Sequence, residues 1–195
     1  PFNQETGKPK NHAGENFSDV FGHAMLRLAE KDSRICAPTA AMVGGTGLEQ
    51  FSKAFPHRFF DVGIAEGCGV SMAAGMAKQG VIPVFAVYST FLQRGYDMLL
   101  HDVGIDSLHV VLAVDRAGLV GDDGETHQGV FDVTYLNSIP GITVYAPANF
   151  VELERMLQEA VYQVEGPVAI RYPRGGQGEF KRDTGREPVV TLRAG

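Results

Sequence analysis

The stretch VIPVFAVYSTFLQRGYDMLLHDVGIDSLHVVLAVDR, residues 81–116, decides how this chain is expected to fold. It contains two short apolar runs rich in valine, Ile82–Tyr88 and Leu108–Val114. Runs this short, with apolar residues on both faces, are typical of strands buried inside a parallel sheet. The segment between them, Phe91–Asp106, has the composition and length of a helix. A strand, a helix and a strand in this order predict one unit of an α/β fold.

The same alternation continues on both sides of this unit. Four further strands are predicted at the apolar runs Ile35–Ala37, Phe59–Ile64, Ile142–Tyr145 and Pro167–Arg171. Further helices are predicted at Asn16–Lys31, Gly67–Lys78, Phe131–Leu136 and Phe150–Gln163. We therefore predict an α/β fold with a mostly parallel sheet and helices on both faces.

The 195 residues suffice for one domain with a buried core. Residues 1–15 are polar and are expected to be a linker, and residues 16–178 are expected to be the domain. Residues 179–195 are expected to be an exit linker, with a short strand at Val189–Leu192. Because the chain starts at Pro1 without a methionine and ends in a polar tail, we expect it to be a piece of a longer protein.

Charge and cysteine content narrow the class of protein. The formal net charge of −6 argues against nucleic-acid binding, which needs clustered Lys and Arg. We find no run near the roughly 20 apolar residues of a membrane span and no signal peptide at the start. Cys36 and Cys68 show no paired spacing. We therefore expect a cytoplasmic protein that contacts neither membrane nor nucleic acid.

Polar side chains follow several of the predicted strands. Ligands of open α/β sheets bind beyond the carboxyl ends of the strands, so these residues are expected to meet at one edge. They include a carboxylate, a phenol, an imidazole and two guanidiniums: Glu66, Tyr88, His127, Arg116 and Arg174. The set predicts a site for an anionic ligand but does not identify a reaction.

Some of these residues also have a purely structural interpretation. Glu66 begins a predicted helix, where the helix dipole favours a carboxylate. Phe91 fits a core position, and Arg94 with Asp97 fits an exposed ion pair that adds little stability. His127 lies in a loop rich in Gly and Asp, which makes a buried structural role less expected.

Two segments resemble known binding loops but depart from their patterns. Gly45-Thr46-Gly47 resembles the start of a dinucleotide fingerprint, yet Gln50 stands where the third glycine belongs. Residues 122–125, DDGE, resemble part of a calcium loop but lack its spacing. The chain has no G-x-S-x-G sequence, so the usual hydrolase nucleophile is absent.

Four segments together identify a family. They are FFDVGIAEGCGVSMAAGMA at 59–77, VYSTFLQRGYDMLLHDV at 87–103, VDRAGLVGDDGETHQGVFDVTYL at 114–136 and RYPRG at 171–175. In order and spacing they resemble 1-deoxy-D-xylulose-5-phosphate synthase over about residues 17–175. Transketolase and the beta subunits of pyruvate dehydrogenase-type enzymes share the fold and the glutamate but match the THQG loop less closely.

The resemblance implies a pyrimidine-binding domain, which is half of an active site. In this family thiamine diphosphate binds between two domains, and the other domain holds its diphosphate and the magnesium ion. That domain's G-D-G signature is missing here, so a diphosphate-binding domain is the implied partner and the chain alone is expected to be inactive. The family is homodimeric and condenses pyruvate with glyceraldehyde 3-phosphate, releasing carbon dioxide.

Three residues match the family positions that hold the cofactor ring. Glu66 matches the glutamate that shares a proton with ring nitrogen N1′, and we expect it to lie in an apolar pocket. Phe91 matches the aromatic residue that stacks on the aminopyrimidine, and Arg94 lies beside it.

Five more residues match positions on the substrate side. Tyr88, Arg116 and Arg174 match groups that bind glyceraldehyde 3-phosphate, and two guanidiniums suit a phosphate dianion. Asp123 matches a polar group lining the site. His127 matches a group placed to transfer a proton.

One departure from the family pattern follows Glu66. The family has Gln or Glu, then His, then Ala, where this chain has Gly67, Cys68 and Gly69. Two glycines are expected to weaken the start of the next helix by about 1 kcal/mol each relative to alanine. Two alternatives therefore stay open: a transketolase-type or 2-oxo-acid dehydrogenase beta-type subunit, and a degenerate, non-catalytic interaction domain.

Overall fold

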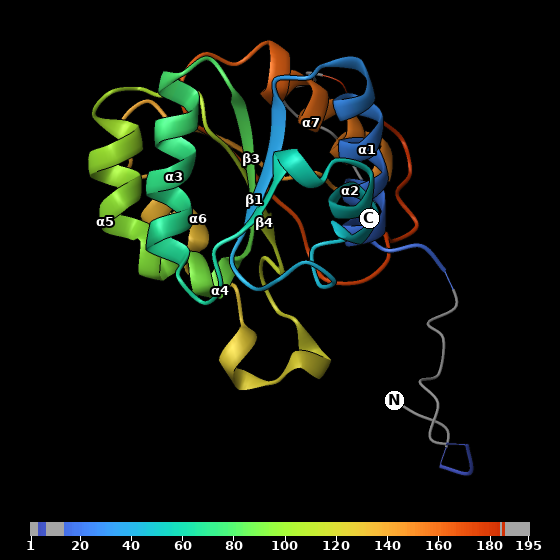
Figure 1. The fold of residues 1–195 in the computed structure, drawn as a ribbon. Coiled ribbons are helices and arrows are strands. Elements are labelled where there is room, and N and C mark those ends of the chain that lie inside the picture. The colour runs from blue at the N-terminus through green and yellow to red at the C-terminus, as the bar shows by residue number, and fades with distance from the viewer. Residues whose placement is uncertain (1–3, 7–13, 184, 186–195) are drawn as a thin grey trace.

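The computed structural model describes residues 4–6, 14–183 and 185. Six strands form one sheet in the order β2-β1-β3-β4-β6-β5, and every pairing is parallel. Helices cover both faces of the sheet (Figure 1). The predicted α/β fold is confirmed. The strand predicted at Val189–Leu192 lies outside the described residues.

The four central strands are buried, as their apolar composition predicts. They are β1 (Ile35–Thr39), β3 (Ile82–Tyr88), β4 (Val111–Asp115) and β6 (Val168–Arg171). The edge strands, β2 (Phe59–Asp61) and β5 (Thr143–Tyr145), are more exposed. The strand predicted at Phe59–Ile64 is shorter because the chain turns after Asp61. There the Asp61 carboxylate accepts hydrogen bonds from the backbone N–H groups of Ala41 (2.7 Å) and Gly63 (2.9 Å).

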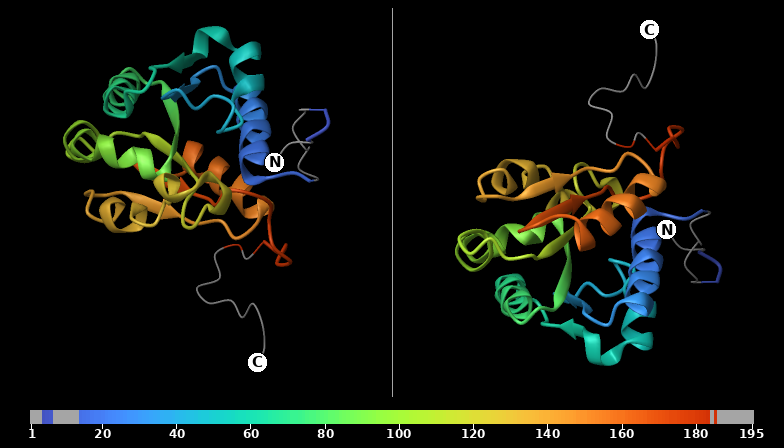
Figure 2. Two further views of the ribbon diagram at one scale, coloured as in Figure 1. Left: turned by 90° about the horizontal axis from the view of Figure 1, so that it is seen from below. Right: turned by 90° about the horizontal axis from the view of Figure 1, so that it is seen from above.

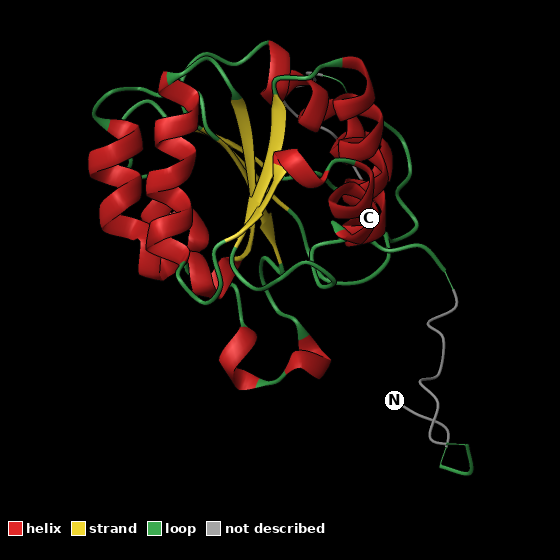
Figure 3. Cartoon of the chain, in the orientation of Figure 1, coloured by secondary structure: helices red, strands yellow, loops and turns green. Residues whose placement is uncertain are grey.

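Two helical layers enclose the sheet (Figures 1 and 3). One layer consists of α1 (Phe17–Lys31), α2 (Glu49–Ala54) and α7 (Phe150–Tyr162). The other contains α3 (Glu66–Lys78), α5 (Tyr96–Met98) and α6 (Asp132–Leu136). Figure 2 shows the same layers from below and from above. Each layer buries its own apolar cluster against the sheet, which fixes the loops at the strand ends.

The helix predicted at Phe91–Asp106 is present as a helical segment, but its pitch changes along its length. The segment is divided into α4 (Ser89–Leu92), a 3-10 turn (Gln93–Gly95), α5 and a π-helical segment (Leu99–Gly104). Such changes of pitch keep an apolar periodicity while they shift the helix axis, and they are frequent at functional sites. Because the segment contains no proline, periodicity alone did not reveal the breaks.

Part of the predicted exit linker packs against the domain. Asn149 Nδ2, just before α7, donates to the backbone oxygen of Arg182 (2.9 Å), and Arg155 Nε donates to Asp183 Oδ1 (3.0 Å). The predicted domain limits, residues 16 and 178, stay a prediction. Within the described part of the chain, no helix is long and apolar enough to cross a bilayer.

Candidate active site

The loops at the carboxyl edge of the sheet diverge next to β1. Strand β2 lies on one side of β1 and β3 on the other, so the chain order reverses there. Such a switch point leaves a crevice in which α/β proteins bind ligands. A hollow of about 430 Å³ lies at this point, lined by Ala40, Ala41, Met42, Ile64, Glu66, Tyr88, Phe91, Arg94 and His127.

Glu66 is the first residue of α3 and is only 3% exposed. Arg94 Nη1 donates a hydrogen bond to Glu66 Oε1 at 2.8 Å, while Oε2 has no partner among the described residues. The expected apolar surroundings therefore include a guanidinium. The Arg94–Asp97 ion pair considered from the sequence does not form, because Asp97 contacts His101 instead (3.0 Å).

Aromatic rings form one wall of the hollow. The rings of Tyr88 and Phe91 are stacked with their centroids 5.8 Å apart, and the His127 ring meets Phe91 edge-on at 5.2 Å. The Arg94 guanidinium carbon lies 5.0 Å from the Phe91 ring centroid. His127 Nδ1 lies 2.9 Å from Thr126 Oγ1. A buried carboxylate and flat aromatic surfaces in one hollow suit a planar, nitrogen-containing ring.

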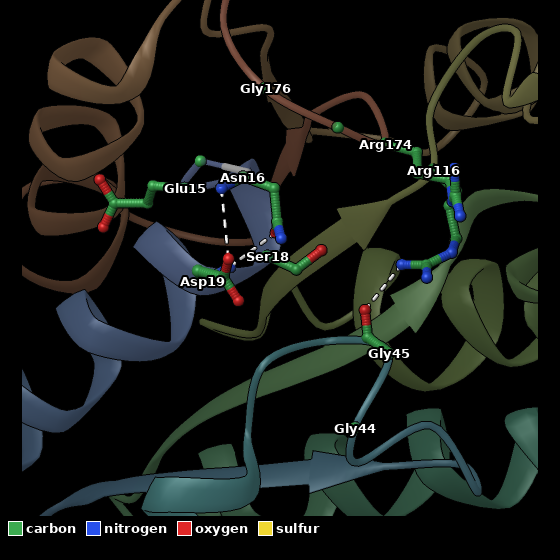
Figure 4. A pocket seen from close by; sticks show the side chains of 11 residues that line it. Glu15, Asn16, Ser18, Asp19, Gly44, Gly45, Arg116, Arg174 and Gly176 are labelled. Atoms are coloured by element: carbon green, nitrogen blue, oxygen red, sulfur yellow. Dashed lines mark hydrogen bonds between the residues drawn. The ribbon is translucent and has the colours of Figure 1, made fainter. Parts of the chain in front are cut away.

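A second hollow, of about 310 Å³, lies at the same edge of the sheet. Figure 4 shows Arg116 and Arg174 on one side of it and the first turn of α1, with Ser18 and Asp19, on the other. Asp123 lies between the two arginines, and its Oδ2 accepts from Arg116 Nε (3.1 Å) and Arg174 Nε (3.0 Å). Two guanidiniums this close to one oxygen atom form a strong anion-binding arrangement.

Tyr88 and Arg116 connect the two hollows. Tyr88 lines the first and Arg116 the second, and the Arg116 guanidinium carbon lies 3.9 Å from the Tyr88 ring centroid. The register of the sheet explains this contact, because Tyr88 on β3 pairs with Asp115 on β4, directly before Arg116. The structure thus brings together all eight residues predicted for the site. Their roles stay predictions.

Arg116 is held in an unusual backbone conformation. Its φ of 58° lies in the left-handed region, which costs a non-glycine residue roughly 1–2 kcal/mol. Its Nη1 donates to the backbone oxygen of Gly45 (2.6 Å) and to Asp115 Oδ1 (3.0 Å). Asp115 also accepts a hydrogen bond from Ser18 Oγ (2.7 Å). Burial raises the pKa of Asp115 to about 6, although its bonds to Arg116 and Ser18 oppose this shift.

Two residues that line the second hollow, Ser18 and Gly45, were not predicted as site residues, and Asp115 at the end of β4 was given no role. Gly45 belongs to the segment that only resembled a dinucleotide loop. A β-carbon there would lie 1.6 Å from the Tyr88 hydroxyl oxygen, so only glycine lets the tyrosine approach. Gly45 lies in the loop after β1. The rule that ligands bind beyond the carboxyl ends of strands would therefore have pointed to it, had we applied the rule to β1. Ser18 lies on a helix far along the chain, and no local signal marked it.

Residues 14–177 match the family described as the transketolase pyrimidine-binding domain. The chain belongs to this family. It is 59% identical over 174 residues to a protein from Clostridium tetani and 52% identical over 188 residues to one from Chlorobium luteolum, both named 1-deoxy-D-xylulose-5-phosphate synthase. These matches cover 89% and 93% of this chain but only 28% and 30% of the relatives. The chain therefore spans less than a third of their length.

Solved structures carry the same fold. A chain described as "Split gene transketolase, inactive beta4 tetramer" is 29% identical, with a TM-score of 0.76, over 90% of this chain and 57% of that one. Transketolase from Leishmania mexicana is 17% identical, with a TM-score of 0.74, over 88% of this chain and 27% of that one. At 17% identity the second match speaks for the fold alone. As a member of the family, this chain has the pyrimidine-binding architecture predicted from its motifs.

Proposed function

We propose that this chain is the pyrimidine-binding half of a 1-deoxy-D-xylulose-5-phosphate synthase. The reaction joins pyruvate to glyceraldehyde 3-phosphate with loss of carbon dioxide. One observation carries the proposal: a buried glutamate beside aromatic rings adjoins a pair of arginines at the same sheet edge. The first group suits the cofactor and the second a phosphorylated acceptor. The names of the relatives at 52–59% identity support the same reaction.

The first hollow fits the aminopyrimidine ring of thiamine diphosphate. Phe91 offers an aromatic face for the ring, and Glu66 Oε2 is free to bind a ring nitrogen. When bound, the cofactor supplies a carbon nucleophile that adds to the carbonyl group of a 2-oxo acid. Glu66 holds the proton at N1′, and Arg94 fixes the glutamate through Oε1. His127 moves a proton at the substrate oxygen atoms.

The second hollow fits the phosphate of the acceptor. Arg116 and Arg174 bind the dianion, Asp123 sets the spacing between them, and Tyr88 orients the aldehyde end. A diphosphate-binding domain, as the partner, holds the cofactor's diphosphate and Mg²⁺. We also propose that the enzyme is a homodimer, as the family resemblance implies. We place it in the cytoplasm because both cysteines are free thiols, as a reducing compartment favours.

A transketolase-type activity is the second candidate, favoured by the 29% identical split-gene neighbour. To separate the two, this chain would be co-expressed with its diphosphate-binding domain and assayed for carbon dioxide release from pyruvate. Release that depends on glyceraldehyde 3-phosphate supports the synthase. Activity only with ketose phosphates points to transketolase, and absence of both activities and of cofactor binding points to a decayed site.

The assignment of Glu66 has its own test. Glu66→Gln keeps the shape of the side chain but cannot exchange the proton, so turnover of the reconstituted enzyme should fall about 10²- to 10⁴-fold. Glu152→Gln is the matched control, because Glu152 is equally buried (3% exposed) but caps α7, outside both hollows. Near-normal turnover of the Glu66 variant would exclude its role in cofactor activation.

A further inference from the structure

We propose that Asp115 is a positioning residue that fixes the Arg116 guanidinium for the acceptor phosphate; the inference rests on the function proposed above. Asp115 ends the central strand β4 and is 0% exposed. It does not line either hollow, so its effect on a ligand has to pass through another residue.

Both oxygens of the Asp115 carboxylate are engaged. Oδ1 accepts from Arg116 Nη1 at 3.0 Å, and Oδ2 accepts from Ser18 Oγ at 2.7 Å. Asp115 therefore holds the side chain of Arg116 and ties it to α1.

Stability alone does not explain a carboxylate at this position. Removing a carboxylate from water is costly even when it is paired, and replacing a whole buried ion pair by well-packed apolar side chains is often neutral or stabilising. The burial that raises the pKa of Asp115 is a sign of this cost. Strained and costly features that persist in one place are typical of functional sites. The left-handed backbone conformation of Arg116 is a second costly feature, directly next to the buried carboxylate of Asp115.

Asp115 provides the rigid part of the support for Arg116. Asp123 also binds this guanidinium, but it lies in the loop that projects from the sheet edge between Gly118 and Gly129. Asp115 lies on a strand that is hydrogen-bonded on both sides, to β3 and to β6. Ser18 ties the same carboxylate to α1, across the second hollow from Arg116 (Figure 4).

The test compares two acceptors in the reconstituted enzyme. Asp115→Asn should lower kcat/KM for glyceraldehyde 3-phosphate about 10- to 100-fold, mainly through KM, while kcat/KM for unphosphorylated D-glyceraldehyde stays near the wild-type value. Asp132→Asn is the matched control, since Asp132 is 1% exposed and pairs with Arg171 (2.9 Å) in the same manner outside the hollows. Equal losses with both acceptors would overturn the proposal.

A double mutant tests whether the effect passes through Arg116. In an Arg116→Lys background, Asp115→Asn should cause little further loss with the phosphorylated acceptor. A full additional loss in that background would contradict the positioning role.

A measurement without turnover keeps this inference separate from the proposed function. The Nε–Hε NMR signal of Arg116, assigned by comparison with Arg116→Lys, should shift in Asp115→Asn and in Ser18→Ala but not in Asp132→Asn. Ser18→Ala removes the hydrogen bond from Ser18 Oγ to Asp115 and leaves the carboxylate in place. This variant tests the positioning role of Asp115 if Asp115→Asn does not fold. An unshifted signal in both variants would refute positioning. If the wild-type enzyme were inactive with both acceptors, the proposed function would be refuted, but the positioning of Arg116 by Asp115 would not.

Discussion

Two glycines in the first turn of α3 have different neighbours, although both depart from the family pattern. A β-carbon at Gly69 would lie 2.7 Å from the ring of Phe85, a fully buried side chain of the core. A β-carbon at Gly67 would lie 3.0 Å from the end of Met98, a flexible side chain. Gly69 is therefore needed for packing beneath Glu66, while Gly67 is not. The GCG sequence is compatible with an intact site.

Alanine substitutions should separate these two glycines. Gly69→Ala should lower the free energy of unfolding by about 1–3 kcal/mol, because the Phe85 ring has to shift in a packed core. Gly67→Ala should raise it by up to about 1 kcal/mol, because alanine favours the helix and Met98 can move aside. Urea denaturation at one pH measures both, and equal effects of the two substitutions would contradict this account.

The buried carboxylate of Asp115 predicts a pH-dependent stability. Burial raises its pKa from 3.8 to about 6, so the folded chain binds more protons than the unfolded chain between these values. Asp115 therefore lowers the free energy of unfolding as the pH rises from about 4 to 6, by about 3 kcal/mol in all.

Asp115→Asn removes this ionisation. The free energy of unfolding of the variant, measured relative to that of the wild type, should increase between pH 4 and 6 and stay level above pH 6. Urea denaturation of both proteins across this range measures this difference, and a difference that does not change with pH would contradict the assignment.

At the scale of elements, the segment between β4 and α6 forms a flap of residues 118–129. Gly118 and Gly129 close its base with reciprocal backbone hydrogen bonds of 2.7 and 2.8 Å. Figure 1 shows the flap projecting from the carboxyl edge of the sheet. Asp123 ties the flap to Arg116 and Arg174 of the second hollow, and His127, also in the flap, lines the first hollow.

Removal of this tie should loosen the flap. Asp123→Ala deletes the ion pairs to both arginines, so backbone amides within residues 119–128 should exchange hydrogen about 3- to 10-fold faster, in line with the loss of roughly 1 kcal/mol. Hydrogen–deuterium exchange read by mass spectrometry measures this. Glu125→Ala, an exposed substitution in the same flap, is the control and should leave the exchange unchanged.

At the scale of the whole molecule, both hollows lie at one edge of the sheet, and large apolar side chains are exposed in the first hollow (Ile64), in the flap (Leu119) and directly after it (Phe131). Ile64 is 83% exposed, Leu119 82% and Phe131 61%. Large apolar side chains that stay exposed on a folded domain are typical of a surface that another domain covers. The surface fits the diphosphate-binding domain of our proposal, which would complete the cofactor site.

Binding of thiamine diphosphate should therefore depend on that partner. The chain by itself should show no tight binding by calorimetry, because the residues proposed to hold the cofactor contact only its pyrimidine ring, and addition of the partner domain should restore tight binding. Phe131→Asp should weaken capture of the partner about 10- to 100-fold, whereas Tyr162→Asp, on α7, should not. Tight cofactor binding by the chain alone would contradict the half-site.

The sequence by itself determined the architecture and the family. Strand identity depends on local composition, and Ile82–Tyr88 is apolar on both faces wherever it packs, so the strand was predicted with its observed limits. The motifs around Glu66, Phe91 and Arg116 carry their chemistry in a short span of residues. Both kinds of signal are local, so they can be recognised from the sequence alone.

Only the tertiary structure decided which of these residues touch. Arg94 binds Glu66, 28 positions away, and not Asp97 nearby. Ser18 reaches Asp115 over 97 positions, and Gly45 receives Arg116 over 71. These contacts arise because a parallel sheet brings the ends of distant strands to one edge, and the spacing of residues along the chain carries no record of that arrangement.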